Sequence, residues 1–187
     1  VETVRAMYER YLGRLPDVDG AVWASERATG NHNRAIAYLM LSQGIVTDRV
    51  EETLDLYFAQ CSVEVSAVDL AIIAATIANH GVHPHTGVQV VSKDVTRDQL
   101  TVALTCGMYD YAGEWAYTVG IPAKSGVGGG ILGILPGVGG IAVFSPRLDG
   151  HGNSVRGLRV FEELSREFGL HVFDPQRPWR GATNRST

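Results

Sequence analysis

The chain has 187 residues, of which 45% are hydrophobic and 19% charged, and its formal net charge at pH 7 is −4. A chain of this length and composition can bury a full hydrophobic core and most naturally forms one domain. The acidic balance argues against a general nucleic-acid-binding protein, which needs a basic face. The two cysteines, Cys61 and Cys106, form neither a disulfide framework nor a Cys-x-x-Cys metal motif, so we expect a reducing, cytoplasmic compartment.

The first half of the sequence predicts five helices, because apolar residues recur there at helical spacing between capping and turn residues. These expected helices cover residues 2–12, 16–28, 33–43, 47–61 and 67–79. The fifth is apolar nearly all round, so we expect it to be central and buried. The chain opens inside the first helix, with neither an initiating methionine nor a signal-peptide core, which predicts a cut end rather than a natural start.

The second half is organised around glycine. Eleven of the 22 glycines lie between Gly107 and Gly140. The uncharged run 126–144 is long enough to span a membrane, but its glycines and the Pro136-Gly137 turn signal favour two buried antiparallel strands instead. We also expect a short strand at 88–91, helices at 96–106 and 156–168, and a polar tail or linker at 173–187.

The order of elements is many helices, then two or three glycine-rich strands, then one helix. This is not an alternating strand–helix pattern, so a doubly wound parallel sheet is not expected. The pattern predicts an α/β protein of the α+β type, in which a mainly helical region packs against an antiparallel sheet.

Lys124 and Ser125 stand at the start of the densest glycine run. In a Walker phosphate loop the lysine follows the glycines and opens a helix, whereas here it precedes them and a strand follows. A lysine, a hydroxyl and a glycine on the edge of an antiparallel strand instead match the Lys-[Thr/Ser]-Gly element of serine β-lactamases and penicillin-binding proteins. The alternative is a surface lysine at the start of a strand.

Four other polar residues are candidates for a site. Tyr57 and Tyr109 could hold a substrate or carry a proton, or they could be core tyrosines with the hydroxyl at the rim. Glu26 and Asn33 flank one turn, where a carboxylate and an amide suit an amino-acid ligand, although solvated helix-end residues would look the same.

Three histidines, at positions 80, 83 and 85, suggest a zinc site by their closeness in sequence. The loop that carries them supplies neither a fourth ligand nor the spacing of known zinc motifs. We therefore expect no metal.

Together these segments closely resemble the serine-dependent glutaminases. The resemblance extends in order, without large gaps, to about residue 172. The segments that carry it are Ser25-Glu-Arg-Ala-Thr-Gly-Asn-His-Asn33, Tyr57-Phe-Ala-Gln-Cys-Ser62, Asp69-Leu-Ala, Ala78-Asn-His-Gly81, Pro84-His-Thr-Gly87, Cys106-Gly-Met-Tyr-Asp110, Gly120-Ile-Pro-Ala-Lys-Ser-Gly-Val-Gly-Gly-Gly130, Ser145-Pro146 and Gly152-Asn-Ser154.

The resemblance implies a β-lactamase-like fold and hydrolysis of L-glutamine to L-glutamate and ammonia, through a glutamyl-enzyme on a serine and without a cofactor. It also implies that residues 1–172 are the C-terminal portion of the catalytic domain, and that the protein is a homo-oligomer, possibly a tetramer. The glutamine-binding positions that the family motifs match are Glu26, Asn33, Tyr57, Tyr109 and Val127.

The resemblance also implies a role for each position. Glu26 would meet the α-amino group, and Asn33 the other polar ends of the substrate. The Val127 N–H would stabilise the oxyanion. Tyr57 and Tyr109 would bracket the nucleophile, and which of them moves its proton is left open. Lys124 would add positive charge and Ser125 a hydrogen bond beside the site.

The family's nucleophile lies in a Ser-x-x-Lys motif, and no serine of this chain has a lysine three residues later. We therefore expect that the nucleophile belongs to an absent N-terminal region and that the isolated chain is inactive. Two alternatives stay open. The chain could be a non-catalytic glutamine-binding or regulatory fragment that pairs with a full-length subunit, or a glycine-loop nucleotide binder.

Overall fold

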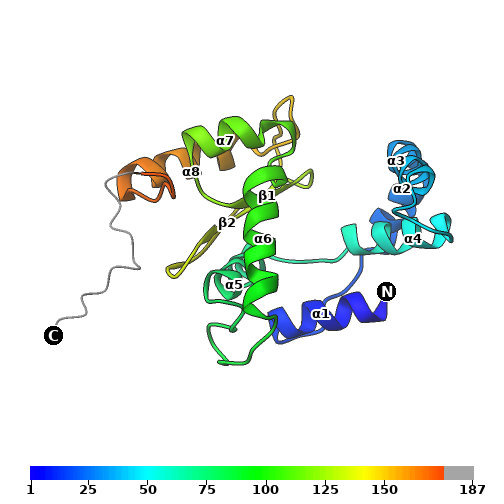
Figure 1. The fold of residues 1–187 in the computed structure, drawn as a ribbon, viewed down its shortest axis with the longest axis horizontal. Helices are drawn as coiled ribbons and strands as arrows, with labels where there is room; N and C mark the ends of the chain where they lie inside the picture. Colours follow the sequence, from blue (N-terminus) through cyan, green and yellow to red (C-terminus); the bar gives the residue numbers. More distant parts are fainter. Residues whose placement is uncertain (175–187) are drawn as a thin grey trace. The chain divides into compact units, whose positions relative to one another are not determined.

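The computed structural model describes residues 1–174, which form two compact units divided between Ser66 and Ala67 (Figure 1). The polar tail expected at residues 173–187 lies outside the described residues from position 175 onward. No helix among residues 1–174 is long and apolar enough to cross a membrane.

The first unit consists of four helices, α1 (Glu2–Leu12), α2 (Gly20–Thr29), α3 (Asn31–Ser42) and α4 (Val50–Cys61). Its core gathers side chains that recur at helical spacing, so that α2 and α3 both pack on α4. The buried members are Ala37, Val50, Leu54 and Phe58, with Trp23, Leu41 and Val46 packed against them. Helix α1 is fastened to the following loop, because the Arg5 guanidinium donates two hydrogen bonds of 3.1 Å to the Pro16 carbonyl.

Three helices of this unit start at other residues than the sequence predicted. The second helix begins at Gly20 and not near Pro16, since Asp17 and Asp19 pair instead with residues 62–64. Asp19 then caps the helix by accepting hydrogen bonds from the Ala21 and Val22 N–H groups. The third helix begins at Asn31, before the expected start at residue 33, and the fourth begins at Val50, after the expected start at residue 47.

The second unit contains a small sheet surrounded by helices. Its helices are α5 (Ala67–Ala78), α6 (Lys93–Cys106), the 3₁₀ turn η1 (Tyr109–Tyr111), α7 (Ala112–Thr118) and α8 (Val155–Phe168). Its strands are β1 (Ala123–Gly126), β2 (Gly130–Leu135) and β3 (Gly139–Phe144), which pair antiparallel in the order β1-β2-β3. The expected turn at Pro136-Gly137 joins β2 to β3, and this confirms the predicted hairpin.

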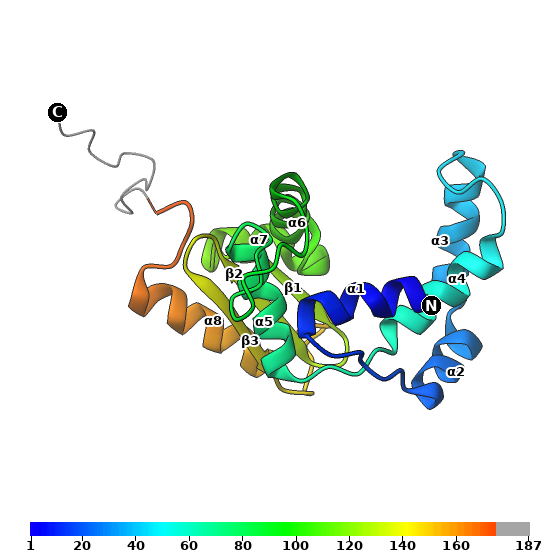
Figure 2. The ribbon, with the colours of Figure 1, turned by 90° about the horizontal axis from the view of Figure 1, so that it is seen from below.

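Helices cover both faces of this sheet (Figure 2). On one face α5 lies directly on the strands: a Cβ built on Gly140 would stand 2.4 Å from the Ala71 carbonyl oxygen. On the other face Trp115 of α7 and Phe161 of α8 pack edge to face, with centroids 5.5 Å apart, over Ile131 and Leu135. The sequence-based prediction of an antiparallel sheet flanked by helices is confirmed.

One expectation for this unit was wrong, and two elements were missed. The segment 88–91 is not a strand of the sheet, because it folds back on residues 81–83 through bonds such as Val90 N–H to the Gly81 carbonyl (2.8 Å). The 3₁₀ turn and α7 were not expected, since Gly107 and Gly113 hide the helical period of residues 109–118.

Candidate active site

Gly107 brings the end of α6 against the free edge of β1. A Cβ built on this glycine would lie 1.7 Å from the Ala123 carbonyl oxygen, so no larger residue fits without moving the backbone. The Ser125 N–H donates to the Gly107 carbonyl at 2.9 Å. The chain therefore runs along the strand edge and delivers Tyr109, two residues later, beside Lys124 and Ser125.

Tyr109, Lys124 and Ser125 form one hydrogen-bonded group. The Tyr109 hydroxyl donates to the Ser125 carbonyl at 3.1 Å, and the Lys124 ammonium donates to the same carbonyl. The ammonium also lies over the Tyr109 ring, 4.7 Å from its centroid. Three of the residues singled out in the sequence are thus in mutual contact.

Ser125 takes part through its backbone rather than its hydroxyl. Side chains alternate along a strand, so Lys124 and Ser125 leave β1 on opposite faces. The Ser125 side chain is only 1% exposed, and within the described chain its hydroxyl has no hydrogen-bond partner. A buried hydroxyl without a partner is uncommon, so it is a group able to bond a ligand or another segment of protein.

Val127 occupies the turn that joins β1 to β2. The Gly129 N–H closes this turn on the Gly126 carbonyl at 2.8 Å, and Gly129 has a φ of +98° that an L side chain rarely adopts. Val127 is 67% exposed, and among the described residues its N–H donates no backbone hydrogen bond. An available N–H beside a lysine and a tyrosine can stabilise a developing negative charge.

Asp110 and His151 make a contact that the sequence did not predict. Their side chains meet at 2.9 Å, Oδ1 to Nδ1, and the His151 ring lies 5.4 Å from that of Tyr111. The hydrogen bond and charge of Asp110 raise the pKa of His151 above its ordinary value. Asp110 lies in a recognisable motif, but nothing in the sequence links it to a histidine 41 positions away.

The remaining predicted residues belong to the first unit. Glu26 lies in the last turn of α2 and Asn33 in the first turn of α3, on either side of Gly30. Gly30 is pressed against α4, since a Cβ built on it would lie 2.4 Å from the Phe58 ring. Tyr57 precedes Phe58, is 46% exposed and meets the Phe58 ring edge-on at 6.0 Å. The fold thus gathers Glu26 and Asn33 at one helix junction.

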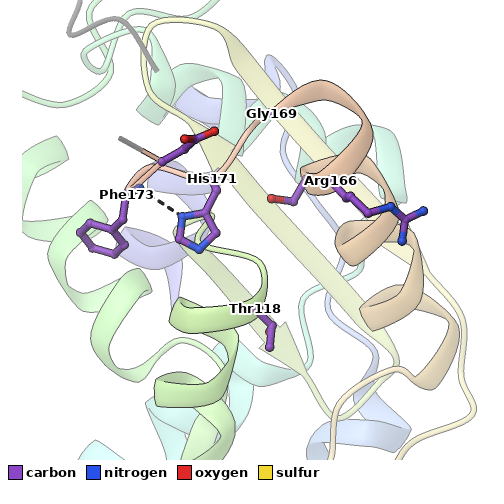
Figure 3. Close-up of a pocket in the computed structure, with 7 residues that line it drawn as sticks. Thr118, Arg166, Gly169, His171 and Phe173 are labelled. Atoms are coloured by element: carbon purple, nitrogen blue, oxygen red, sulfur yellow. Dashed lines mark hydrogen bonds between the residues drawn. The ribbon is translucent and has the colours of Figure 1, made fainter. Parts of the chain in front are cut away.

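A hollow of about 430 Å³ lies elsewhere in the second unit, beside the end of α8 (Figure 3). Its lining consists of Thr118, Ser165, Arg166, Gly169, His171, Phe173 and Asp174. The His171 ring accepts a hydrogen bond from the Phe173 N–H and fits against Gly120, whose φ is +61°. None of the residues predicted for the site lines this hollow, so we do not assign the chemistry to it.

The fold and the edge-strand element together define a class. A helical region, an antiparallel sheet and a Lys-Ser-Gly sequence on its edge strand are features of the β-lactamase-like proteins. Comparison with known proteins then identifies the family. Residues 1–173 match the family described as Glutaminase, and the chain belongs to that family.

Individual relatives agree with this assignment. The chain is 52% identical to a glutaminase of Microcystis aeruginosa and 56% identical to one of Nostoc sp., covering 96% and 95% of this chain and 53% of each relative. It thus spans about half the length of these curated relatives. Among solved structures it superposes with a TM-score of 0.88 and 36% identity on the covalent complex of the Bacillus subtilis glutaminase YbgJ with 5-oxo-L-norleucine, over 92% of this chain and 61% of that one.

Proposed function

We propose that residues 1–172 are the C-terminal portion of a glutaminase catalytic domain, and that this domain hydrolyses L-glutamine to L-glutamate and ammonia. Membership of the glutaminase family is the observation that carries the proposal. Since none of the 187 residues belongs to a Ser-x-x-Lys motif, the nucleophilic serine comes from a region outside this sequence.

The reaction has two stages. The serine oxygen attacks the side-chain carbonyl carbon of glutamine, and the carbon–nitrogen bond breaks as the leaving nitrogen takes a proton to depart as ammonia. Water then attacks the glutamyl ester and releases glutamate and the serine. Each stage builds negative charge on the former carbonyl oxygen, and the Val127 N–H donates to it.

The second unit supplies proton transfer. The Tyr109 hydroxyl moves a proton between the serine and the leaving group, while the Lys124 ammonium beside its ring favours the negatively charged state of nearby oxygens. Tyr57 is the other candidate for the proton carrier. The Ser125 carbonyl orients both Tyr109 and Lys124, which supports a shared role for the three residues.

The first unit supplies recognition of the amino-acid end of glutamine. The Glu26 carboxylate pairs with the α-ammonium group in a charge-assisted hydrogen bond, and the Asn33 amide bonds the remaining polar atoms. Their common position at the α2–α3 junction supports this assignment. Tyr57, exposed on α4, borders the substrate.

Three further parts of the proposal rest on the family resemblance, except that the compartment rests on the two cysteines, which form no disulfide framework. The protein acts without a metal or organic cofactor, in the cytoplasm, and as a homo-oligomer such as a tetramer. Sedimentation or light scattering of the purified protein measures the last of these directly. A monomer at micromolar concentration would contradict it.

Covalent trapping tests the proposed reaction. The chain is produced together with the remaining half of the Nostoc relative, in which we expect the Ser-x-x-Lys region, and is treated with 6-diazo-5-oxo-L-norleucine, the reagent that gave the Bacillus subtilis complex. Mass spectrometry should find the label on the serine of the added segment. A label on a residue of this chain would contradict the assignment of the nucleophile.

A second candidate is a fragment that binds glutamine without chemistry and pairs with a full-length subunit. The absence of Ser-x-x-Lys from all 187 residues favours it. Calorimetric titration of the isolated chain with glutamine separates the two functions. Binding by the isolated chain, without ammonia release after addition of the missing region, supports the non-catalytic fragment.

A further inference from the structure

The turn formed by residues 149–153, which lies outside the predicted site, is closed by its own first residue. The Asp149 carboxylate accepts hydrogen bonds from the backbone N–H groups of His151 and Asn153, each at 2.9 Å. The Asp149 N–H in turn donates to the Asn153 carbonyl at 2.9 Å. Asn153 is fully buried, so the turn is anchored at its far end as well.

This turn lies close to two residues of the proposed site. Gly152 has a φ of +86°, and a Cβ built on it would lie 3.6 Å from Val127 Cγ1 and 3.8 Å from Tyr109 Cε2. These are ordinary van der Waals distances. The backbone of Gly152 therefore lies next to both the tyrosine ring and the valine side chain.

His151 connects the same turn to the residue after Tyr109. Its Nδ1 lies 2.9 Å from the Asp110 carboxylate, and its ring is stacked at a tilt of 36° on the Tyr111 ring. The turn is thus joined to the 3₁₀ segment on both sides of Asp110.

Tyr109 itself needs such support. Its φ of +58° lies in the left-handed region, which is unfavourable for a bulky residue and persists only where the surroundings hold it. The Tyr109 hydroxyl is held by the Ser125 carbonyl at 3.1 Å, but this bond fixes only the far end of the ring. The contacts of Asp110 fix the backbone beside it.

We propose that Asp110 and His151 are positioning residues: their ion pair ties the 149–153 turn to the 3₁₀ segment and thereby holds the Tyr109 ring over Lys124 and beside Val127. Protonation of His151 controls how firmly the ring is held. The consequence for catalysis rests on the proposed function, whereas the link between His151 and Tyr109 can be measured in this chain alone.

The charges around His151 determine the pH range. Three carboxylates face His151: Asp110 from the 3₁₀ turn, Asp149 from the same turn as His151, and Glu114 from α7. Among the described residues, the only ring stacked on the His151 ring is that of Tyr111. All three carboxylates favour the imidazolium, which agrees with the raised pKa of His151. The ion pair forms where Asp110 is ionised and His151 protonated, and it is lost as pH rises through the raised pKa.

The test is an NMR titration of this chain labelled on histidine and tyrosine rings, from pH 5 to pH 9. The Tyr109 signals are assigned by their loss in Y109F. In the wild type they should shift with the same midpoint as His151, above the ordinary histidine value of about 6.5. D110N should move the His151 midpoint back toward about 6.5 and remove the coupled shift of Tyr109.

D98N is the matched control, since Asp98 is an exposed carboxylate on α6 paired with Arg97. It should leave both titrations unchanged. The proposal is overturned if the Tyr109 signals do not follow His151, or if D110N leaves the His151 midpoint where it was. Circular dichroism of the wild type and of each variant checks that the protein is folded.

A kinetic measurement on the complemented enzyme tests the consequence for catalysis. H151F keeps a ring on Tyr111 but loses the bond to Asp110, and it should lower kcat about 10-fold, with a smaller change in KM, and abolish the decline in kcat that follows His151 deprotonation. H151Q, whose amide can still donate a hydrogen bond to Asp110 but carries no charge, should recover only part of kcat and should show no decline in kcat with rising pH. Equal kcat in wild type and H151F would contradict positioning, whereas absence of wild-type activity would contradict the proposed function and leave the NMR result to decide the link.

Discussion

The Lys124 ammonium lies 4.7 Å from the centroid of the Tyr109 ring, and both side chains donate to the same carbonyl, that of Ser125. Neither residue can therefore be changed without affecting the other. A cation over an aromatic ring contributes about 0.5–1 kcal/mol where it is exposed to solvent. The contact therefore contributes little to the free energy of folding. We infer that its importance lies in the relative positions of the two side chains that it maintains.

Replacing this lysine should affect activity much more than stability. K124M should lower the free energy of unfolding by at most about 1 kcal/mol. In the complemented enzyme it should lower kcat/KM by about 100-fold or more, since it removes the positive charge beside Tyr109, the proposed proton carrier. Urea denaturation and an ammonia assay measure the two effects.

The chain offers one matched control, since Lys93 is its only other lysine. Lys93 opens α6, away from the Tyr109 group, and its side chain is exposed. K93M should change neither the free energy of unfolding nor kcat/KM appreciably. Equal losses of activity in K93M and K124M would show that the effect is a general one of charge.

Gly107 should tolerate no side chain, although its φ is that of an ordinary helical residue. The methyl group of G107A would collide with the Ala123 carbonyl, and neither backbone can move without separating α6 from β1. We expect a loss of about 1–3 kcal/mol or more in the free energy of unfolding. G113A is the control: nothing lies within 4 Å of that position inside α7, so it should gain about 0.5–1 kcal/mol.

Gly107 also shows which parts of the site could be predicted from the sequence. The clustered glycines predicted a close approach of backbone to something, and the motifs identified Tyr109, Lys124 and Val127. The sequence could not show that the approaching partner is β1 itself, or that Ser125 contributes its carbonyl rather than its hydroxyl. Those facts depend on strand register, which period-2 patterns specify poorly in a glycine-rich strand.

The Asp110–His151 pair was beyond sequence reasoning for a different reason. Its two members are 41 residues apart, and each sits in a segment of turn residues without periodicity. The unexpected 3₁₀ turn and α7 fix where Asp110 points. Because those two elements were not predicted, the sequence showed only that Asp110 follows Tyr109 in the chain, and not where its side chain points.

The contact of α5 with the sheet can be tested at two adjacent glycines. G140A would place a methyl group 2.4 Å from the backbone of α5, at the Ala71 carbonyl and the Ala75 N–H, and should cost about 1–3 kcal/mol. G139A points away from α5, with nothing within 4 Å, and should be nearly neutral. Similar urea midpoints for the two variants would contradict the packing described for this face.

The first unit should carry the affinity for the α-ammonium group of glutamine. E26Q removes the charge-assisted hydrogen bond, so the Kd of the complemented protein for glutamine should rise by about 10- to 100-fold. E9Q, a change on α1, is the control and should leave the Kd unchanged. A calorimetric titration in which both variants bind like the wild type would remove Glu26 from the site.

The His151–Asp110 pair predicts a pH dependence of stability. Because folding raises the pKa of His151, its contribution is fully present below the unfolded value of about 6.5 and disappears as pH rises through the folded value. The difference in urea midpoint between wild type and H151F should therefore be larger at pH 6 than at pH 9. A difference in urea midpoint that grows with pH would contradict the predicted direction of the pH dependence.

Ammonia release from glutamine tests the central claim most directly. The isolated chain should release none, and the same chain combined with the Ser-x-x-Lys region of a relative should release ammonia at a rate that depends on that serine and on Lys124. Ammonia release by the isolated chain would show that the nucleophile lies within these 187 residues. If the combined protein releases no ammonia although both parts are folded, the chain does not complete the catalytic site.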